Sequence, residues 1–240
     1  MTSKDAVRET VWTLMERGNA SRFPGARGRI PNFTGAEAAA EMLAAQPEWS
    51  AAQVVKSNPD APQLPVRAGA LADGKLLFMA VPRLASNRPF LRLDPRRLSA
   101  RPRESASIRG ASKLGRPITI RQMRHVDLIV CGSVAVNRLG ARVGKGGGFS
   151  DLEFALLTEA GLVDDRTLVT TTIHPLQLLD DPLPETGHDF RVDLIVTPDA
   201  VIRPPKRARR RPTGIVWTDL TPEKVEQIPV LRNFRPPGGG

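Results

Sequence analysis

The sequence predicts an α/β fold of three layers, in which a mostly parallel central sheet carries helices on both faces. The apolar runs LLFMAV and DLIVCGSVAV show no polar alternation, which is typical of strands buried on both faces. Segments with helical spacing separate such runs, as in parallel sheets whose strands are joined by helices. With 240 residues, of which 40% are hydrophobic, the chain can bury a core of this size.

The first predicted element is a helix over 3–18. Ser3 can cap its first turn, Gly18 can end its last turn, and apolar residues recur at helical spacing from Val7 to Met15. The elements that follow alternate between loop, helix and strand: a loop rich in Gly, Pro and Arg at 21–35, a helix at 36–45, a strand within 51–57, a helix at 66–72 and a strand within 74–82.

Three strand segments are expected in the second half. Residues 83–116 are rich in Arg, Pro and Ser, and no long element is predicted there. The clearest central strand is 127–136, 166–174 is the next, and 191–202 supplies one or two more. We therefore expect one domain over 1–202, a basic linker or loop at 203–212, a strand and helix at 213–234 that pack back on the domain, and a disordered tail at 235–240.

Composition limits the function classes. The single cysteine, Cys131, cannot form an internal disulfide, and no Cys/His cluster has zinc-ligand spacing. Cys131 follows an apolar run and is interpreted as a small buried residue. No apolar run is long enough to cross a membrane, and the N-terminus lacks the pattern of a secretion signal. We expect a cytoplasmic protein with no membrane contact.

The positive charge is concentrated in one stretch. Six basic residues and no acidic residue occupy 203–212, so the formal charge of +10 falls to +10 − 6 = +4 without them. A weak contact with nucleic-acid phosphates through 203–211 is one interpretation. A solvated charge run is the other, and the aromatic residues expected for base stacking are absent from the stretch.

The most informative segment lies between a predicted strand and a predicted helix. Glycines occupy positions 144, 146, 147 and 148, and Ser150 and Glu153 follow at the spacing of a capping box. Glycine backbone N–H groups can converge on an anion at a helix N-terminus, and Arg142 and Lys145 add full positive charges. The pattern predicts a phosphate site, although a mobile glycine loop would have the same composition. It is neither a P-loop nor a dinucleotide fingerprint.

This segment resembles the signature of the 5-formyltetrahydrofolate cyclo-ligase (methenyltetrahydrofolate synthetase) family, in which Arg, a hydrophobic residue, glycines, two tyrosines and Asp follow in fixed order. Residues 142–151 fall on that order without a gap. The motifs GSVAVNRLGARVGKGGGFSDLE, RIPNF and IPVLRNF are similar to the methenyltetrahydrofolate synthetase domain-containing branch, and the matching motifs extend from Lys4 to Phe234. The resemblance implies a NagB/RpiA/CoA-transferase-like fold.

The resemblance also implies a nucleotide site. Lys4 and Arg8 match a basic pair that contacts the triphosphate, and both lie within or at the edge of the apolar arc of the first helix instead of opposite it. Two solvated side chains at a helix start are the alternative. The other residues implied in binding ATP are Arg142, Gly144, Lys145, Gly146, Gly147, Gly148, Phe149 and Ser150. Of these, Lys4, Arg8, Arg142 and Lys145 are the expected catalytic cations.

Magnesium is implied to bind Asp151 and Asp189, since hard carboxylate oxygens suit this ion. Each has another interpretation: Asp151 complements a helix dipole, and Asp189 belongs to a turn. Asp193 is a second candidate, for which a structural hydrogen bond is favoured. The three histidines, His125, His174 and His188, are interpreted as structural.

The implied reaction is the ATP- and Mg-dependent cyclisation of 5-formyltetrahydrofolate, or of a related reduced folate, to 5,10-methenyltetrahydrofolate. The chain departs from the family pattern because it contains no tyrosine, so Phe149 and Ser150 replace the paired tyrosines. A family Glu that contacts the pterin has no match either, and Asp60 and Gln63 are the nearest substitutes. The alternative is a non-catalytic relative that binds nucleotide or RNA through the glycines and the basic stretch.

Overall fold

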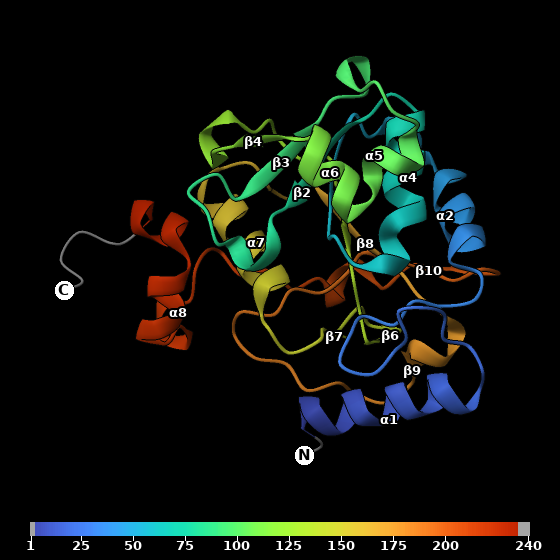
Figure 1. The fold of residues 1–240 in the computed structure, drawn as a ribbon. Coiled ribbons are helices and arrows are strands. Elements are labelled where there is room, and N and C mark those ends of the chain that lie inside the picture. The colour runs from blue at the N-terminus through green and yellow to red at the C-terminus, as the bar shows by residue number, and fades with distance from the viewer. Residues whose placement is uncertain (1–2, 235–240) are drawn as a thin grey trace.

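An eight-stranded sheet forms the centre of the computed structural model, which describes residues 3–234 (Figure 1). In spatial order the strands are β11 (Val201–Ile202), β10 (Leu194–Val196), β8 (Leu168–Thr172), β5 (Leu128–Cys131), β1 (Val54–Ser57), β2 (Leu76–Ala80), β3 (Phe90–Leu93) and β4 (Arg116–Ile118). The five strands from β10 to β2 pair in parallel, and β11, β3 and β4 pair antiparallel at the edges. The predicted mostly parallel sheet is confirmed.

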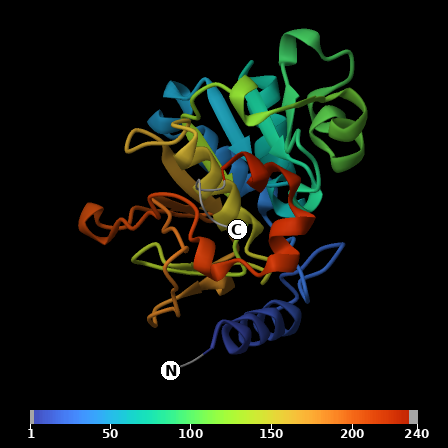
Figure 2. The same ribbon diagram turned by 90° about the vertical axis from the view of Figure 1, so that its left-hand side faces the viewer.

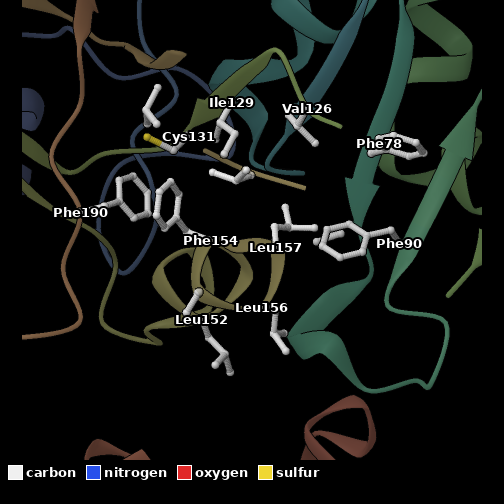
Figure 3. Packing of buried hydrophobic residues seen from close by; sticks show 14 of the residues in the cluster. Phe78, Phe90, Val126, Ile129, Cys131, Leu152, Phe154, Leu156, Leu157 and Phe190 are labelled. Atoms are coloured by element: carbon white, nitrogen blue, oxygen red, sulfur yellow. The ribbon is translucent and has the colours of Figure 1, made fainter. Parts of the chain in front are cut away.

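Helices cover both faces of this sheet (Figure 2). One face carries α2 (Ala36–Ala44), α3 (Pro47–Ala51), α4 (Leu64–Ala72), α5 (Pro102–Ala106) and α6 (Ile108–Leu114), and the other carries α7 (Phe149–Glu159) and α8 (Pro222–Gln227). Successive strand residues point to opposite faces: Leu77 and Met79 pack with the first group, whereas Leu76 and Phe78 pack with α7 (Figure 3). These are the three layers expected from the unalternated apolar runs.

A smaller sheet lies at one end of the molecule, in the order β7 (Arg142–Val143), β6 (Ala135–Asn137) and β9 (Leu178–Leu179). Helix α1 (Lys4–Arg17) lies beside it (Figure 1) and buries Val7, Val11 and Met15 in a cluster shared with Val143. The predicted cap is confirmed, since Ser3 Oγ accepts from the Ala6 N–H at 3.1 Å.

The segment 127–136 is two strands instead of the single central strand we predicted. Strand β5 ends at Cys131, and β6 begins at Ala135 in the smaller sheet. Gly132 lies at this break, where an added Cβ would stand 2.9 Å from a side-chain carbon of Ile30. Because Ile30 of the 21–35 loop approaches this closely, only a glycine fits at the point where the chain leaves β5.

The C-terminal segment packs on the body and contains no strand within 203–234. Its predicted strand is wrong: the Ile215 N–H donates to Glu159 Oε1 at 2.7 Å instead of to a neighbouring strand. The predicted helix is present as α8, and Ile228, Val230 and Leu231 are buried in the cluster that contains α7. The expected tail at 235–240 lies outside the described residues.

Most other elements match their predicted positions within a few residues. Within 83–118 the antiparallel strands β3 and β4 and the short helices α5 and α6 were not predicted, since Arg, Pro and Ser obscure their apolar pattern. Leu14 belongs to the apolar residues at helical spacing between Val7 and Met15, but it is 39% exposed. None of the helices in 3–234 has the length and apolarity needed to cross a bilayer.

Candidate functional site

Five residues, 144–148, connect β7 to α7 and form a tight glycine loop. Gly146 has φ 106° and Gly148 has φ 66°, values that residues with a side chain rarely adopt. Gly148 is the N-cap of α7, so the first N–H groups of the helix, which have no acceptor within it, adjoin the loop. The sequence-predicted arrangement of glycines directly before a helix N-terminus is confirmed.

The predicted capping box is wrong. Gly148, in a left-handed conformation, is the N-cap of α7, and the helix begins at Phe149. Ser150 is therefore the second helical residue, and its side chain does not cap the helix. Ser150 Oγ instead donates to Asn58 Oδ1 at 3.4 Å. Glu153 is buried, forms an ion pair with Lys56, and accepts from Asn58 Nδ2 at 3.1 Å. The spacing that suggested a cap thus serves contacts between α7 and the end of β1.

Helix α1 brings Arg8 to the loop across 136 residues of sequence and brings Lys4 to Asp189. Arg8 Nε donates to the carbonyl oxygen of Gly144 at 2.7 Å. A Cβ on Gly146 would lie 3.5 Å from Arg8 Cζ, so the guanidinium lies beside the middle of the loop as well. Lys4 Nζ lies 2.7 and 2.6 Å from the two carboxylate oxygens of Asp189. Of the two, Arg8 contacts the glycine segment, whereas Lys4 contacts Asp189 instead.

Arg142 is a buried cation behind the loop. Its Nη2 donates to Asp151 Oδ1 at 2.7 Å, and its guanidinium lies 4.2 Å from the centroid of the Phe190 ring. Burial acts to lower the pKa of Arg142, but the negative charge of Asp151, with a smaller contribution from Asp189, outweighs it and raises the pKa. The guanidinium therefore stays charged within the protein.

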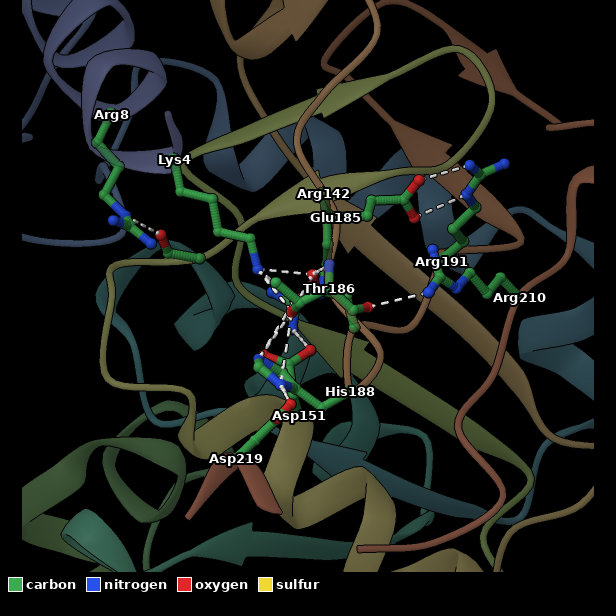
Figure 4. A network of polar contacts seen from close by, with 12 residues as sticks. Lys4, Arg8, Arg142, Asp151, Glu185, Thr186, His188, Arg191, Arg210 and Asp219 are labelled. Carbon is green, nitrogen blue, oxygen red and sulfur yellow. Dashed lines mark hydrogen bonds and ion pairs between the residues drawn. The ribbon is translucent and has the colours of Figure 1, made fainter. Parts of the chain in front are cut away.

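Lys4, Thr186 and His188 lie in a network of polar contacts (Figure 4), to which Asp189 belongs through its bonds with Lys4 and Thr186. Its carboxylate accepts from Lys4 Nζ and, at 2.9 Å, from Thr186 Oγ1. Burial acts to raise the pKa of Asp189, but the contacts with Lys4 and the Thr186 N–H lower it below its ordinary value. Arg210 Nη2 donates to the Thr186 carbonyl at 3.1 Å, which holds this turn from its other side.

Asp151 and Asp189 were predicted to hold magnesium, and the negative charges of both act to raise the pKa of Arg142. No group of three or more His, Cys, Asp or Glu side chains within 3–234 has metal-site geometry. Two carboxylates nevertheless suit Mg²⁺, which commonly takes one or two protein carboxylates together with phosphate oxygens and water. In the structure each carboxylate has a protein cation as its partner.

Lys145 lies exposed in the loop, and Phe149, the first residue of α7, directly follows the loop. Lys145 Nζ donates to Asp60 Oδ1 at 2.7 Å, which places Asp60, one of the two substitutes for the family Glu, at the glycine loop. The other substitute, Gln63, is fully buried. Phe149 is partly buried against the core that contains α7.

The sequence did not identify Lys224 of α8 as part of this region. Lys224 Nζ donates to the Gly147 carbonyl at 3.2 Å and lies 5.6 Å from the centroid of the Phe149 ring. Asp219, in the same segment, contacts His188 Nδ1. A cavity between α7 and 215–224 is lined by these charged residues and by Asp151. No local motif marks Lys224, because 77 residues separate it from the loop.

The remaining candidates have structural contacts. Asp193 Oδ2 accepts from the Val169 N–H at 2.8 Å, the kind of structural hydrogen bond favoured by its strand position. His174 Nδ1 accepts from the Leu176 N–H at 3.2 Å, and burial lowers the pKa of His174. Cys131 is buried, as expected, and burial raises the pKa of its thiol.

The basic stretch contacts the body of the protein. Arg211 donates to Asp193 Oδ2 at 2.6 Å and to two backbone carbonyls, and Arg209 also pairs with Asp193. Arg203 pairs with Glu48 at 2.6 Å. Three of its six basic residues therefore have carboxylate partners within the chain. This use of the arginines does not favour nucleic-acid contact.

The sequence of the chain is similar to those of known proteins. Residues 1–198 match the sequence profile of the 5-formyltetrahydrofolate cyclo-ligase family. The chain is 39% identical to the methenyltetrahydrofolate synthase domain-containing protein of Mus musculus, over 97% of this chain and 63% of that protein. For the Homo sapiens protein of the same name the identity is 37%, over 97% and 61%. The chain thus spans less than two thirds of the length of these curated relatives.

The fold is also found among solved structures. An NMR structure of Aquifex aeolicus 5,10-methenyltetrahydrofolate synthetase aligns with a TM-score of 0.54 and 23% identity, over 83% of this chain and 92% of that one. At this identity the likeness extends to the fold alone.

Proposed function

Since the chain belongs to the 5-formyltetrahydrofolate cyclo-ligase family, we propose that it binds ATP with magnesium on the glycine loop and closes 5-formyltetrahydrofolate to 5,10-methenyltetrahydrofolate. One observation carries the proposal: the guanidinium of Arg8 lies on the loop between Gly144 and Gly146. A helix N-terminus, glycine amides and a cation delivered by α1 thus meet at one place, and each of these groups favours phosphate oxygens.

The surrounding cations suit a triphosphate. Lys4, Arg142 and Lys145 each have one carboxylate partner in the structure. Lys4 and Lys145 are partly exposed, so phosphate oxygens can approach them without unfolding any element. Arg142, which belongs to β7, is buried, and its role is to hold Asp151 in place beside the loop.

Asp151 and Asp189 are the residues that would hold magnesium. Their hard oxygen atoms fit this ion, and their two negative charges lie beside the proposed phosphate site. Bound there with the nucleotide, the ion would neutralise charge on the phosphate oxygens. For Asp189 to bind it, Lys4 would transfer its contact from the carboxylate to the phosphate.

The reaction needs little covalent chemistry from the protein. The formyl oxygen on N5 attacks the γ-phosphorus, and ADP leaves. N10 then attacks the activated formyl carbon and loses its proton, and the C–O bond to phosphate breaks, which gives 5,10-methenyltetrahydrofolate and inorganic phosphate. Phosphoryl transfer of this kind is accelerated mainly by alignment and charge neutralisation. Arg8 and Lys145 would supply charge, and the loop amides would orient the γ-phosphate.

Phe149 and Asp60 would lie on the folate side of the site. The partly buried ring of Phe149 offers an apolar face to the pterin or to adenine. Asp60, which follows β1 in the sequence, accepts from Lys145 of the glycine loop. Hydrogen bonds from a carboxylate to a heterocycle give strong selectivity, because the wrong ligand leaves its partners unpaired.

A turnover assay tests the proposal. Full-length protein supplied with 5-formyltetrahydrofolate, ATP and Mg²⁺ is expected to produce the absorbance of methenyltetrahydrofolate. Arg8→Met should lower kcat/KM for ATP about tenfold to a hundredfold, since one charge-assisted contact is lost. Arg17→Met, on the same helix but in its last turn, is the matched control and should retain activity. Nucleotide binding without turnover would instead identify a non-catalytic relative.

A further inference from the structure

We propose that Lys224, on the C-terminal helix α8, is a further binding residue for the nucleotide's β- and γ-phosphates. The inference rests on the proposed function and adds a residue from outside the family match, which ends at residue 198. The segment 213–234, which we call the C-terminal strap, would then complete the phosphate site from the side opposite to α1.

Lys224 lies against the last two glycines of the loop. Its Nζ donates to the Gly147 carbonyl at 3.2 Å, and a Cβ on Gly148 would stand 3.1 Å from the same Nζ. Arg8 donates to the Gly144 carbonyl and lies beside Gly146. The two cations therefore contact opposite ends of one five-residue loop, which is the arrangement expected around an extended polyphosphate.

The surroundings of the Lys224 charge differ from those of the other cations near the loop. Lys4, Arg142 and Lys145 each have a carboxylate within 4 Å, whereas no carboxylate lies within that distance of Lys224 Nζ in residues 3–234. Its acceptors are a neutral carbonyl and the face of Phe149. Moreover, Gly148 is the N-cap of α7, where the helix dipole adds partial positive charge. The ammonium group of Lys224 beside this positive helix end is favourable when an anion lies between the lysine and the helix end.

The strap is anchored at several points, so the lysine is held in place. The Ile215 N–H donates to Glu159 Oε1 at 2.7 Å, and Asp219 contacts His188 Nδ1. Beyond α8, Ile228 and Leu231 are buried in the main core. Figure 2 shows the strap crossing in front of α7. A cation that is held before the ligand arrives loses little conformational freedom on binding.

Calorimetric titration of the full-length protein with the magnesium complex of AMP-PNP tests this role. Lys224→Gln should weaken binding about tenfold, the loss expected for one charge-assisted contact to phosphate. Lys224→Arg should restore the affinity to within about threefold of the wild type. Lys113→Gln, an exposed lysine on α6, is the matched surface control and should bind as the wild type does.

AMP separates a phosphate contact from a structural effect, because it lacks the β- and γ-phosphates. The affinity for AMP should not change in Lys224→Gln, and the midpoint of thermal unfolding should stay within about 2 °C of the wild type. Equal AMP-PNP affinity in Lys224→Gln and the wild type would overturn the inference alone. An equal loss for AMP and AMP-PNP would overturn it too. Absence of AMP-PNP binding to the wild type would overturn the proposed function and, with it, the inference.

Discussion

Two regions of this molecule are rich in positive charge, and their surroundings differ. In the basic stretch, Arg209 and Arg211 donate to Asp193 and to backbone carbonyls of the body. At the glycine loop, Arg8 and Lys224 donate to carbonyl oxygens of the loop, and the loop leads into the helix N-terminus of α7, whose first N–H groups are also donors. Cations in both regions thus contact oxygen atoms of the chain, but those of the basic stretch share the partly buried carboxylate of Asp193, whereas those at the glycine loop lie beside further donors. The groups that face a cation thus indicate its role better than the number of cations in a stretch.

The largest effect is expected from Arg142→Met. The substitution leaves Asp151 largely buried without its cation, which should cost about 3–5 kcal/mol in the free energy of unfolding. Nucleotide affinity should fall as well, because Asp151 and the end of β7 border the loop. Urea unfolding and calorimetric titration measure the two effects. Unchanged stability would show that Asp151 does not depend on this ion pair.

Arg211→Met provides the counterpart in the basic stretch. It should reduce stability by about 2 kcal/mol, because Asp193 and two carbonyl oxygens lose a donor. The affinity for AMP-PNP, however, should stay within about twofold of the wild type. If nucleotide binding fell tenfold while the protein remained folded, the distinction between the two regions would be wrong.

Two glycines with similar backbone conformations sharpen the comparison. Gly148 has φ 66° at the start of α7, and Gly161 has φ 69° just after its end. Replacing either with Ala should cost about 1 kcal/mol of stability, since a Cβ disfavours positive φ. Only Gly148→Ala should also weaken AMP-PNP binding, by about tenfold, because its Cβ would approach Lys224 Nζ. Titrations that show equal losses in both variants would argue against a specific role for the loop.

The smallest effect is expected at the ion pair between Glu48 and Arg203, as a change in how stability depends on pH. Partial burial acts to raise the pKa of Glu48, but the hydrogen bond from Arg203, a backbone hydrogen bond and the charge of Arg203 together outweigh burial and lower the pKa. A carboxyl group with a lowered pKa stabilises the fold above its ordinary pKa of about 4.3, and this contribution is lost as the pH falls through the lowered value. Glu48→Gln should therefore be about 0.5 kcal/mol less stable at pH 7 and equal to the wild type in strong acid. A difference that grows on acidification would contradict the assignment.

The sequence predicted the elements whose signals are local. The cap at Ser3, the unalternated strands and the glycines before α7 depend on residues close together in the chain, and the structure contains all three. The position of Arg8 was also predictable, since a basic residue at the edge of an apolar helical face must meet another part of the protein.

The rest depended on contacts between distant segments. Ser150 and Glu153 had the spacing of a capping box, but Glu153 is the buried partner of Lys56 nearly one hundred residues earlier. The C-terminal aliphatic residues suggested a strand, yet they fill the core beside α7 without pairing in a sheet. Lys224 carried no signal at all, because only the path of the strap brings it to Gly147.

Hydrogen–deuterium exchange tests most directly whether the glycine loop binds the nucleotide. On addition of the magnesium complex of AMP-PNP, we predict slower exchange in peptides that contain 144–151 and 4–8, and unchanged exchange in 203–211. Protection confined to 203–211, or no protection of 144–151 under conditions where the nucleotide is bound, would contradict the claim.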